Sequence, residues 1–167
     1  MKKNKLYIMI GIPGSGKSTY ARYIIMNNEN TCWISRDGIR LSLLTVNDNY
    51  FAKENQVYKN FVLQINNELK AGRDVIADAT HINSKSRYKL FNKLHIDRTK
   101  TTVIGIYMNL PLETCLERNK VRKGNRAIVP PHEVHNMYLR MEPPTYNEPF
   151  DYIYTFDGKE MKLLERR

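Results

Sequence analysis

The sequence predicts an α/β fold in which a parallel sheet is covered by helices on both faces. Apolar runs of strand length alternate along the chain with stretches whose apolar residues recur at helical spacing. Such an alternation connects neighbouring strands through helices, which makes the strands parallel and buries both faces of the sheet. The 167 residues fit one domain. We therefore expect a three-layer α/β/α unit over residues 1–167 with a five-stranded parallel sheet.

Each element is placed by its own pattern of apolar residues, turn residues and prolines. Residues 54–69 place five apolar side chains on one helical face, and Ala71 and Gly72 provide the end of that helix. Pro111 stands where helices tolerate proline. The expected strands are 6–10, 31–34, 74–77, 101–108 and 150–156, and the expected helices are 17–27, 54–69 and four that begin near residues 36, 84, 111 and 130. Ligands of such sheets bind at the carboxyl ends of the strands, where the motifs below fall.

The chain carries an excess of positive charge. It has 27 lysines and arginines against 17 acidic residues, a formal net charge of +10. A basic surface attracts polyanions and speeds their capture, so the charge favours a nucleic-acid partner. Solubility or overall composition explains the same excess equally well.

Cysteine usage and hydropathy favour a cytoplasmic protein without a membrane partner. The apolar runs are of strand length and too short to cross a bilayer. Cys32 and Cys115 are far apart and lack the spacing of a zinc site or a disulfide framework, which favours a reducing compartment.

A complete phosphate-binding loop (P-loop) follows the first expected strand. Residues 11–18 read G-I-P-G-S-G-K-S and lead directly into a helix. The glycines let successive backbone N–H groups face phosphate oxygens, and the helix N-terminus adds partial positive charge. We expect Lys17 to reach the β- and γ-phosphates of ATP and Ser18 to coordinate Mg²⁺. A chance match in a Gly-rich turn is the alternative, and the full pattern in this position disfavours it. The residues expected at the nucleotide are Gly11, Pro13, Gly14, Ser15, Gly16, Lys17, Ser18 and Thr19.

An acidic and a basic residue stand together just after the second expected strand. Asp37 and Arg40 are three residues apart and share one face of a helix. A carboxylate at the end of a strand can accept a proton from an attacking hydroxyl, while the arginine binds an anion nearby. The alternative is an aspartate at a helix N-terminus in an exposed ion pair.

The third expected strand ends in D-A-T-H-I-N at residues 78–83. Asp78 follows the apolar run, where P-loop enzymes keep an acid that helps to hold Mg²⁺. Thr80 and Asn83 are also common turn and cap residues. His81 is expected at the surface or in contact with substrate, and not as a catalytic group.

A basic segment covers residues 118–126, where five of nine side chains are positive and none is acidic. It ends a helix, so we interpret it as a connector that closes over ATP and brings Arg118, Arg122 and Arg126 to the phosphates. Cations at a helix C-terminus are also ordinary partners of the helix dipole, which is the alternative. Arg122 is the residue most expected to act on the transferring group.

These segments in this order resemble the kinase domain of the phage 5′-polynucleotide kinase/phosphatase family. More widely, they resemble the AAA_33-like P-loop kinases that include zeta toxins and chloramphenicol phosphotransferase. The resemblance covers about residues 2–146, with R-D-G-I-R at 36–40 and R-N-K-V-R-K-G, A-I-V-P and M-Y-L-R-M between 116 and 141 as its specific parts. It implies an adenylate-kinase-like P-loop NTPase fold with a basic lid at about residues 118–130.

The resemblance implies an ATP- and Mg²⁺-dependent kinase that phosphorylates the 5′-hydroxyl of RNA or DNA. Asp37 then deprotonates the acceptor hydroxyl, Arg40 holds a nucleic-acid phosphate and Arg122 engages ATP. The family's acid at the third strand falls one residue away from Asp78. We expect no phosphatase domain after the last strand, and we expect 3′-end processing to require a separate phosphatase or ligase partner.

Two other functions are compatible with the sequence. The same chemistry can act on a small hydroxyl compound (a nucleoside, nucleotide, sugar or antibiotic) or on a modified base in DNA. We expect residues 45–53 and the helix after them to shape that acceptor side. A GTPase switch or an ATPase is disfavoured, because no D-x-x-G follows the P-loop and N-K-V-R at 119–122 has Arg where guanine recognition needs Asp.

Overall fold

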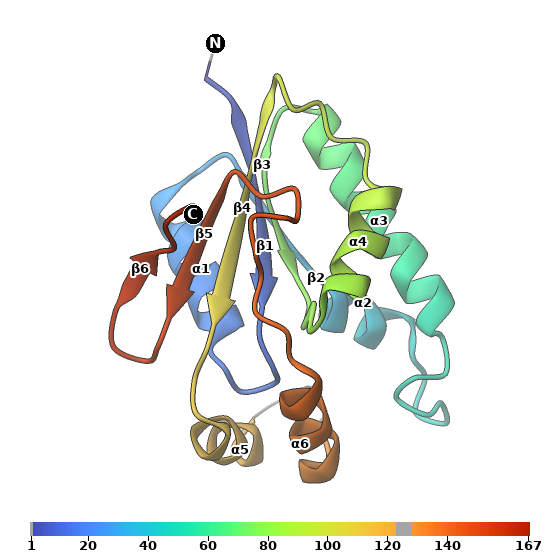
Figure 1. The fold of residues 1–167 in the computed structure, drawn as a ribbon. Coiled ribbons are helices and arrows are strands. Elements are labelled where there is room, and N and C mark those ends of the chain that lie inside the picture. The colour runs from blue at the N-terminus through green and yellow to red at the C-terminus, as the bar shows by residue number, and fades with distance from the viewer. Residues whose placement is uncertain (1, 123–127) are drawn as a thin grey trace.

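The computed structural model describes residues 2–122 and 128–167 and shows a sheet between two layers of helices (Figure 1). The strands are β1 (Asn4–Ile10), β2 (Thr31–Ser35), β3 (Asp74–Asp78), β4 (Thr101–Met108), β5 (Tyr152–Phe156) and β6 (Met161–Leu163). The helices are α1 (Lys17–Asn27), α2 (Arg36–Leu43), α3 (Glu54–Lys70), α4 (Ser84–Lys93), α5 (Leu112–Lys120) and α6 (Pro131–Arg140). The strand order is β2-β3-β1-β4-β5-β6, with the first five parallel. The expected three-layer α/β/α fold is confirmed.

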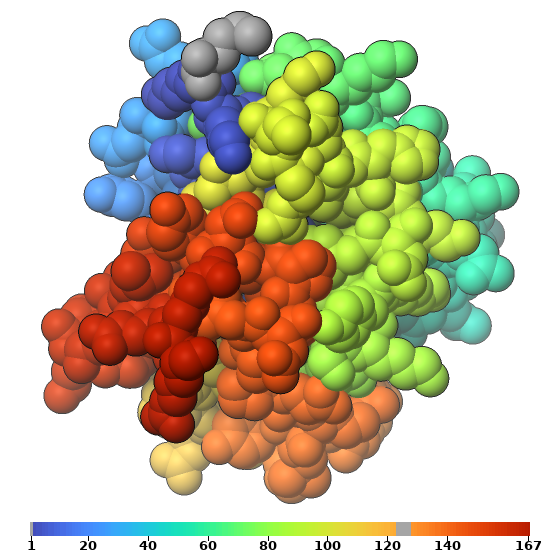
Figure 2. All heavy atoms as spheres, turned by 45° about the horizontal axis from the view of Figure 1, so that its top comes forward, coloured from blue at the N-terminus to red at the C-terminus, as the bar shows by residue number. Residues whose placement is uncertain are grey.

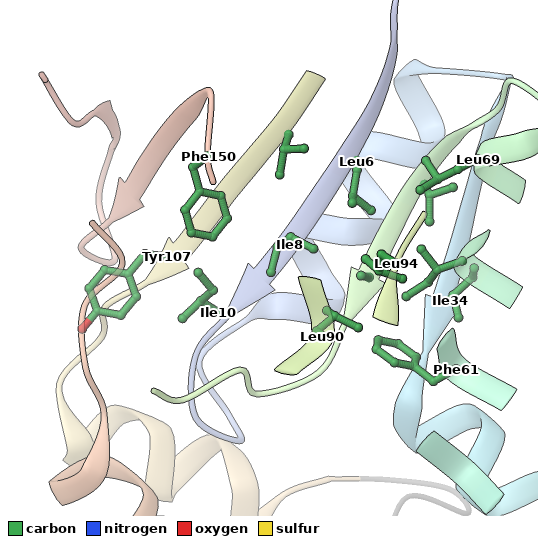
Figure 3. Close-up of a cluster of buried hydrophobic side chains, with 14 of the residues drawn as sticks. Leu6, Ile8, Ile10, Ile34, Phe61, Leu69, Leu90, Leu94, Tyr107 and Phe150 are labelled. Atoms are coloured by element: carbon green, nitrogen blue, oxygen red, sulfur yellow. The ribbon is translucent and has the colours of Figure 1, made fainter. Parts of the chain in front are cut away.

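Successive residues of the strands face two separate parts of the core. Leu6 and Ile8 of β1 pack with α3 and α4, whereas Tyr7 packs with α1, α5 and α6. Figure 3 shows the first cluster, which contains Phe61 of α3 and Leu90 of α4 together with these two β1 residues, Leu6 and Ile8. Because side chains alternate along a strand and both faces of β1 are apolar, this strand lies between two helical layers.

The longest helix, α3, is amphipathic as its sequence predicts. Its buried side chains are Val57, Phe61, Ile65 and Leu69, which recur at helical spacing. Gly72 follows the helix with φ of 80°, a left-handed conformation that ends helices. Within the described residues, no helix has both the length and the apolar character needed to cross a membrane.

The sheet has one strand more than expected, and that strand is antiparallel. β6 pairs with β5, with Met161 opposite Phe156. The turn between them contains Gly158 at φ of 101°, and Asp157 Oδ1 accepts hydrogen bonds from the backbone N–H groups of Lys159 and Glu160. Three residues carry too little alternation for the sequence to predict the strand after this turn.

The end of the chain folds back over the segment that precedes β5 (Figure 2). The Tyr146 hydroxyl donates to the carbonyl oxygen of Leu164 at 2.6 Å. The Arg166 guanidinium lies over the Tyr146 ring and donates to the carbonyl oxygens of Phe150 and Asp151. These contacts hold the last residues against the sheet.

A buried ion pair connects α4 with the segment between α6 and β5. Arg87 is fully buried and donates to both carboxylate oxygens of Glu148, while its Nη1 donates to the carbonyl oxygen of His81 at 2.8 Å. The backbone N–H of Glu142, just after α6, donates to the carbonyl oxygen of Ile82 at 2.7 Å. These bonds join the loop after β3 to the end of α6.

The carboxyl ends of β1, β2 and β3 lie side by side. Asp78, the last residue of β3, is level with Met9 in β1 and with Ser35 in β2. The P-loop follows β1 and α2 follows β2. The sheet therefore brings three of the predicted motifs to one edge.

Candidate active site

The P-loop bends as its glycines predict. Gly14 and Gly16 have φ of 82° and 93°, which residues with a Cβ rarely adopt. A Cβ on Gly14 would lie 2.2 Å from the carbonyl oxygen of Cys115, so the loop packs directly against α5. The loop then leads into the N-terminus of α1 at Lys17, which favours an anion at this position.

The ammonium of Lys17 is buried within the loop. Its Nζ donates to the carbonyl oxygens of Gly11 at 2.8 Å and Ile12 at 3.0 Å. Burial lowers the pKa of Lys17, while the carboxylates of Asp78 and Asp37 act in the opposite direction. Lys17 is thus within electrostatic reach of both acids that the sequence singled out.

Asp78 and Ser18 form an oxygen-rich corner beside the loop. The Ser18 hydroxyl donates to Asp78 Oδ2 at 3.4 Å, and the indole N–H of Trp33 donates to the same oxygen at 3.0 Å. Burial raises the pKa of Asp78, whereas Lys17 and these two donors lower it. Mg²⁺ usually takes one or two protein oxygens and completes its shell with water and phosphate. A hydroxyl and a carboxylate next to a phosphate loop fit that requirement.

Asp37 and Arg40 share one face of α2, as their spacing predicts, and Tyr50 joins them. Arg40 Nη1 and the Tyr50 hydroxyl both donate to Asp37 Oδ1, the hydroxyl at 2.8 Å. Burial, with Asp37 nearby, raises the pKa of Tyr50 to about 12, so the phenol keeps its proton. Among the described residues, Asp37 Oδ2 has no hydrogen-bond partner, and the side chain is 53% exposed. One carboxylate oxygen is held and the other is free to accept a proton.

Arg40 is buried between two carboxylates. Its Nε donates to Glu54 Oε1 at 2.5 Å and its Nη2 donates to Glu54 Oε2 at 3.1 Å. Its Nη1 donates to Asp37 Oδ1. Glu54 also accepts a hydrogen bond from Arg36 at 3.0 Å. Burial opposes the charge of Arg40, but the Glu54 hydrogen bonds and the electrostatic effects of Tyr50, Asp37 and Glu54 together outweigh it and raise the pKa of Arg40. The expected contact of Arg40 with a substrate phosphate stays a prediction.

A cavity of about 640 Å³ connects the P-loop with Asp37. Its wall includes most of the residues that the sequence singled out. They are Pro13, Gly14, Gly16, Lys17, Ser18, Thr19, Asp37, Arg40, Asp78, Arg118 and Arg122. Gly11 and Ser15 lie in the loop without lining the cavity, and Arg126 lies outside the described residues.

The expected lid is described only at its two ends. Arg118 Nη1 lies 3.4 Å from the position of a Cβ on Gly16, so this arginine reaches the P-loop. Arg122 lines the cavity and adds to the effect of burial in lowering the pKa of Lys17. Buried Asn119 donates to the carbonyl oxygen of Val129 at 2.6 Å and accepts from its N–H at 3.4 Å. Asn119 therefore joins the two ends of this segment.

The residues after Asp78 have structural roles. Asn83 caps α4 by accepting a hydrogen bond from the Ser86 N–H at 2.8 Å. The expectation that His81 lies at the surface is wrong, because the side chain is 7% exposed and Nδ1 donates to the carbonyl oxygen of Met9 at 2.6 Å. Burial lowers the pKa of His81 to about 4. His81 therefore supports the end of β1 as a neutral side chain.

Four residues of the site were not singled out from the sequence. They are Trp33, Tyr50, Glu54 and Asn119. Tyr50 lies in the segment expected to shape the acceptor side, and Glu54 begins the helix after it. Trp33 is the chain's single tryptophan, and this rarity was the one available signal. Asn119 offered none, since its partner is ten residues away across the basic segment.

Comparison with protein families assigns this fold and site to a known class. The AAA_33 family model, described as an AAA domain, matches residues 6–144. The chain belongs to this family of P-loop kinase domains. The predicted resemblance is confirmed at the level of the family.

Individual relatives add detail. The "Putative bifunctional polynucleotide kinase/RNA ligase" of Autographa californica nuclear polyhedrosis virus is 29% identical over 149 residues, 81% of this chain and 20% of the relative. A chain of the Pnkp1/Rnl/Hen1 RNA repair complex has a TM-score of 0.66 at 23% identity, over 84% of this chain and 44% of that chain. A gluconokinase from Sinorhizobium meliloti has a TM-score of 0.60 at 14% identity, over 96% of this chain and 86% of that chain. The two structures establish the fold, and this chain spans less than half of the first two relatives.

Proposed function

We propose that this protein is an ATP-dependent polynucleotide 5′-hydroxyl kinase that acts on RNA or DNA ends. The observation that carries the proposal is that Asp37, with one oxygen free, and the P-loop line the same cavity. A carboxylate beside a phosphate loop suits activation of an acceptor hydroxyl. The polynucleotide kinase relative and the net charge of +10 support a nucleic-acid acceptor.

In the proposed reaction, Asp37 Oδ2 accepts the proton of the acceptor hydroxyl as that oxygen bonds to the γ-phosphorus of ATP. The bond from the γ-phosphorus to the β–γ bridging oxygen breaks, and ADP leaves with the electron pair. Lys17 and Arg122 stabilise charge on the transferring group, a role in which one arginine contributes roughly 10³–10⁵ in rate. Ser18 and Asp78 would hold Mg²⁺, which would supply further neutralisation of phosphate charge.

The remaining predicted residues divide between donor and acceptor. Residues 11–19 bind the phosphates of ATP, with Arg118, Arg122 and Arg126 closing over them. Arg40 orients Asp37 and holds a phosphate of the acceptor strand. Residues 1–167 act as one kinase domain with a lid at about residues 118–130. We further propose that a phosphatase or ligase outside this domain completes end processing, in line with the ligase named for the viral relative.

The experiment is to incubate the protein with Mg²⁺, labelled ATP and 5′-hydroxyl oligonucleotides of RNA and DNA. We expect 5′-end labelling, reduced about 10²–10⁴-fold by Asp37→Asn, because the general base is lost. Asp97→Asn is a matched control, since Asp97 is 51% exposed and also pairs with a cation three residues later. A wild-type protein that labels no oligonucleotide, or an Asp37→Asn variant as active as wild type, contradicts the proposal.

A second candidate is a kinase for a small hydroxyl compound, which the structural similarity to a gluconokinase favours. The two candidates differ in salt dependence. Polynucleotide binding releases counterions and weakens steeply with added salt, whereas binding of a neutral polyol does not. Turnover of a sugar that is insensitive to salt, without oligonucleotide labelling, selects the second candidate.

A further inference from the structure

Phe51 is an aromatic side chain without a role in the core. It is 55% exposed, and it belongs to neither hydrophobic cluster of the described residues. It lies on the wall of the cavity that also contains Asp37. Binding sites are commonly lined by such aromatic surface, with a few polar groups that fix orientation. Its position therefore suits contact with the acceptor.

The Phe51 ring is held in place by the acceptor residues themselves. It meets the Tyr50 ring edge to face, with the ring centroids 4.8 Å apart at an angle of 86°. The Tyr50 hydroxyl is fixed by Asp37 at 2.8 Å and by Arg40 at 3.0 Å. The Arg40 guanidinium lies 4.6 Å from the Tyr50 ring centroid and 5.5 Å from that of Phe51. The aromatic pair and the proposed general base form one connected unit.

The chemistry of this pair fits a nucleobase. Every base has a flat π face, so stacking on an aromatic side chain tolerates different sequences. A small polyol instead requires several free hydrogen-bonding groups, but the Tyr50 hydroxyl next to Phe51 is already engaged by Arg40 and Asp37. The exposed surface of Phe51 is apolar, which suits a stacked ring better than a phosphate.

We propose that Phe51, supported by Tyr50, stacks on the base of the terminal nucleotide whose 5′-hydroxyl is phosphorylated. This inference rests on the proposed kinase function and specifies its acceptor as an end with an unpaired terminal base. Tyr50 connects base binding with activation of the hydroxyl, because its ring supports Phe51 while its hydroxyl donates to Asp37 Oδ1. The bound base then places its own 5′-hydroxyl next to the free Oδ2.

The test compares two single-stranded 5′-hydroxyl oligonucleotides, one intact and one that lacks only the terminal base. For the intact oligonucleotide we expect Phe51→Ala to raise KM about 5- to 150-fold, the range of one base–aromatic stack, with a smaller effect on kcat. For the abasic oligonucleotide, wild type and Phe51→Ala should have the same KM. Phe51→Trp should retain the wild-type preference, because its ring also stacks. Val46→Ala is the control in the same segment, since Val46 is fully exposed and does not line the cavity.

Three outcomes overturn the inference. Wild-type protein that phosphorylates both oligonucleotides with the same KM shows that the terminal base is not bound. An equal loss by Phe51→Ala on both oligonucleotides assigns Phe51 a structural role, and fluorescence anisotropy of oligonucleotide binding checks that result without turnover. If wild type labels no 5′-hydroxyl oligonucleotide, the proposed function fails and this inference fails with it. The first two results leave the kinase function intact.

Discussion

The buried carboxylate of Asp78 depends on single side chains that lie far from it in sequence. Trp33 and Ser18 both donate to Oδ2, from 45 and 60 residues away. Burial raises the pKa of Asp78, so the ionised form requires these donors. The indole N–H is the closer donor and is the single polar group of the Trp33 side chain. Trp33 is therefore a positioning residue for the proposed metal ligand.

Replacing Trp33 by Phe keeps an aromatic ring and removes this donor. We expect the free energy of unfolding at neutral pH to fall by about 1–3 kcal/mol, the effect of leaving a buried acceptor unsatisfied. Urea denaturation measures the change. In an Asp78→Asn background the same replacement should cost less, because the charge that needs the donor is gone. If the Trp33 replacement lowers the free energy of unfolding equally in the wild-type and Asp78→Asn backgrounds, it removed only packing and no hydrogen bond.

His81 should make the stability of the protein depend on pH below neutrality. Burial lowers its pKa from 6.5 to about 4, so the unfolded chain takes up a proton at pH values where the folded protein does not. A histidine with a lowered folded-state pKa contributes stability above pH 6.5, and this contribution is lost as the pH falls toward 4. The pKa difference between the unfolded value of 6.5 and the folded value of about 4 corresponds to a loss of about 3 kcal/mol in the free energy of unfolding. Denaturant titrations between these pH values measure the loss.

The matched variant is His81→Asn, which removes the titrating group. Asparagine tolerates the left-handed φ of 45° at this position and offers an amide donor to the carbonyl oxygen of Met9. Its stability should fall less than that of wild type over the same pH range. His132→Asn is the control, because the His132 side chain is 73% exposed. Equal pH dependence of wild type and His81→Asn would refute the assignment.

At the scale of elements, helix ends determine where the site segments begin. Ser35 caps α2 by accepting from the N–H of Gly38 at 3.1 Å, two residues before Asp37. Asn83 caps α4 by accepting from the N–H of Ser86. These caps satisfy free N–H groups of the first helical turn. They also fix the point at which the chain leaves β2 and β3, and so the position of the residues between strand and helix.

The connection between α5 and α6 depends on Asn119. Replacing it by Ala leaves the buried Val129 carbonyl without its donor at 2.6 Å, so we expect a loss of about 1–3 kcal/mol in unfolding free energy. The Val129 N–H also loses its acceptor, and its hydrogen exchange should become faster. Lys120→Ala is the control, because its ion pair with Glu117 is exposed and contributes less than about 1 kcal/mol. Unchanged exchange at Val129 would contradict this role.

At the scale of the whole molecule, the Arg87–Glu148 pair joins the loop after β3, α4 and the segment before β5. Removing one partner leaves a buried charge alone, so Arg87→Met or Glu148→Leu should each cost about 3–5 kcal/mol. The double variant should lose clearly less free energy of unfolding than the sum of the two single losses, as measured by urea denaturation. The surface pair of Arg73 and Glu68 is the control, with about 1 kcal/mol or less for each single change. Additive costs at the buried pair would exclude its role as a coupled unit.

Much of the fold could be predicted because its signals are local. Alternating strand and helix patterns, with a P-loop after the first strand, indicated the α/β class, and all five expected strands have bounds within two residues of those observed. β6 was not predicted, because its three residues are too few to show an alternation of apolar and polar side chains. The surface position expected for His81 was wrong because its burial depends on β1, about 70 residues away.

The candidate site was predictable only in part, for the same physical reason. Motif spacing identified Lys17, Asp37 and Arg122 as residues near one edge of the sheet, and all three line one cavity. The partners that orient these groups could not be derived, because a hydrogen bond needs a distance and an angle that no spacing rule supplies. Tyr50 and Glu54 reach Asp37 and Arg40 only once α3 packs beside α2.

The P-loop is the part of this protein that the sequence by itself determined. Its left-handed glycines and the hydrogen bond from its lysine to Gly11 lie within eight residues, so the local sequence predicts the bend of the loop. The tertiary structure alone decided which oxygen of Asp37 is free, which donors hold Asp78, and that Phe51 lies exposed beside them. These features come from residues up to 60 positions apart, whose side chains meet only when the strands align their carboxyl ends.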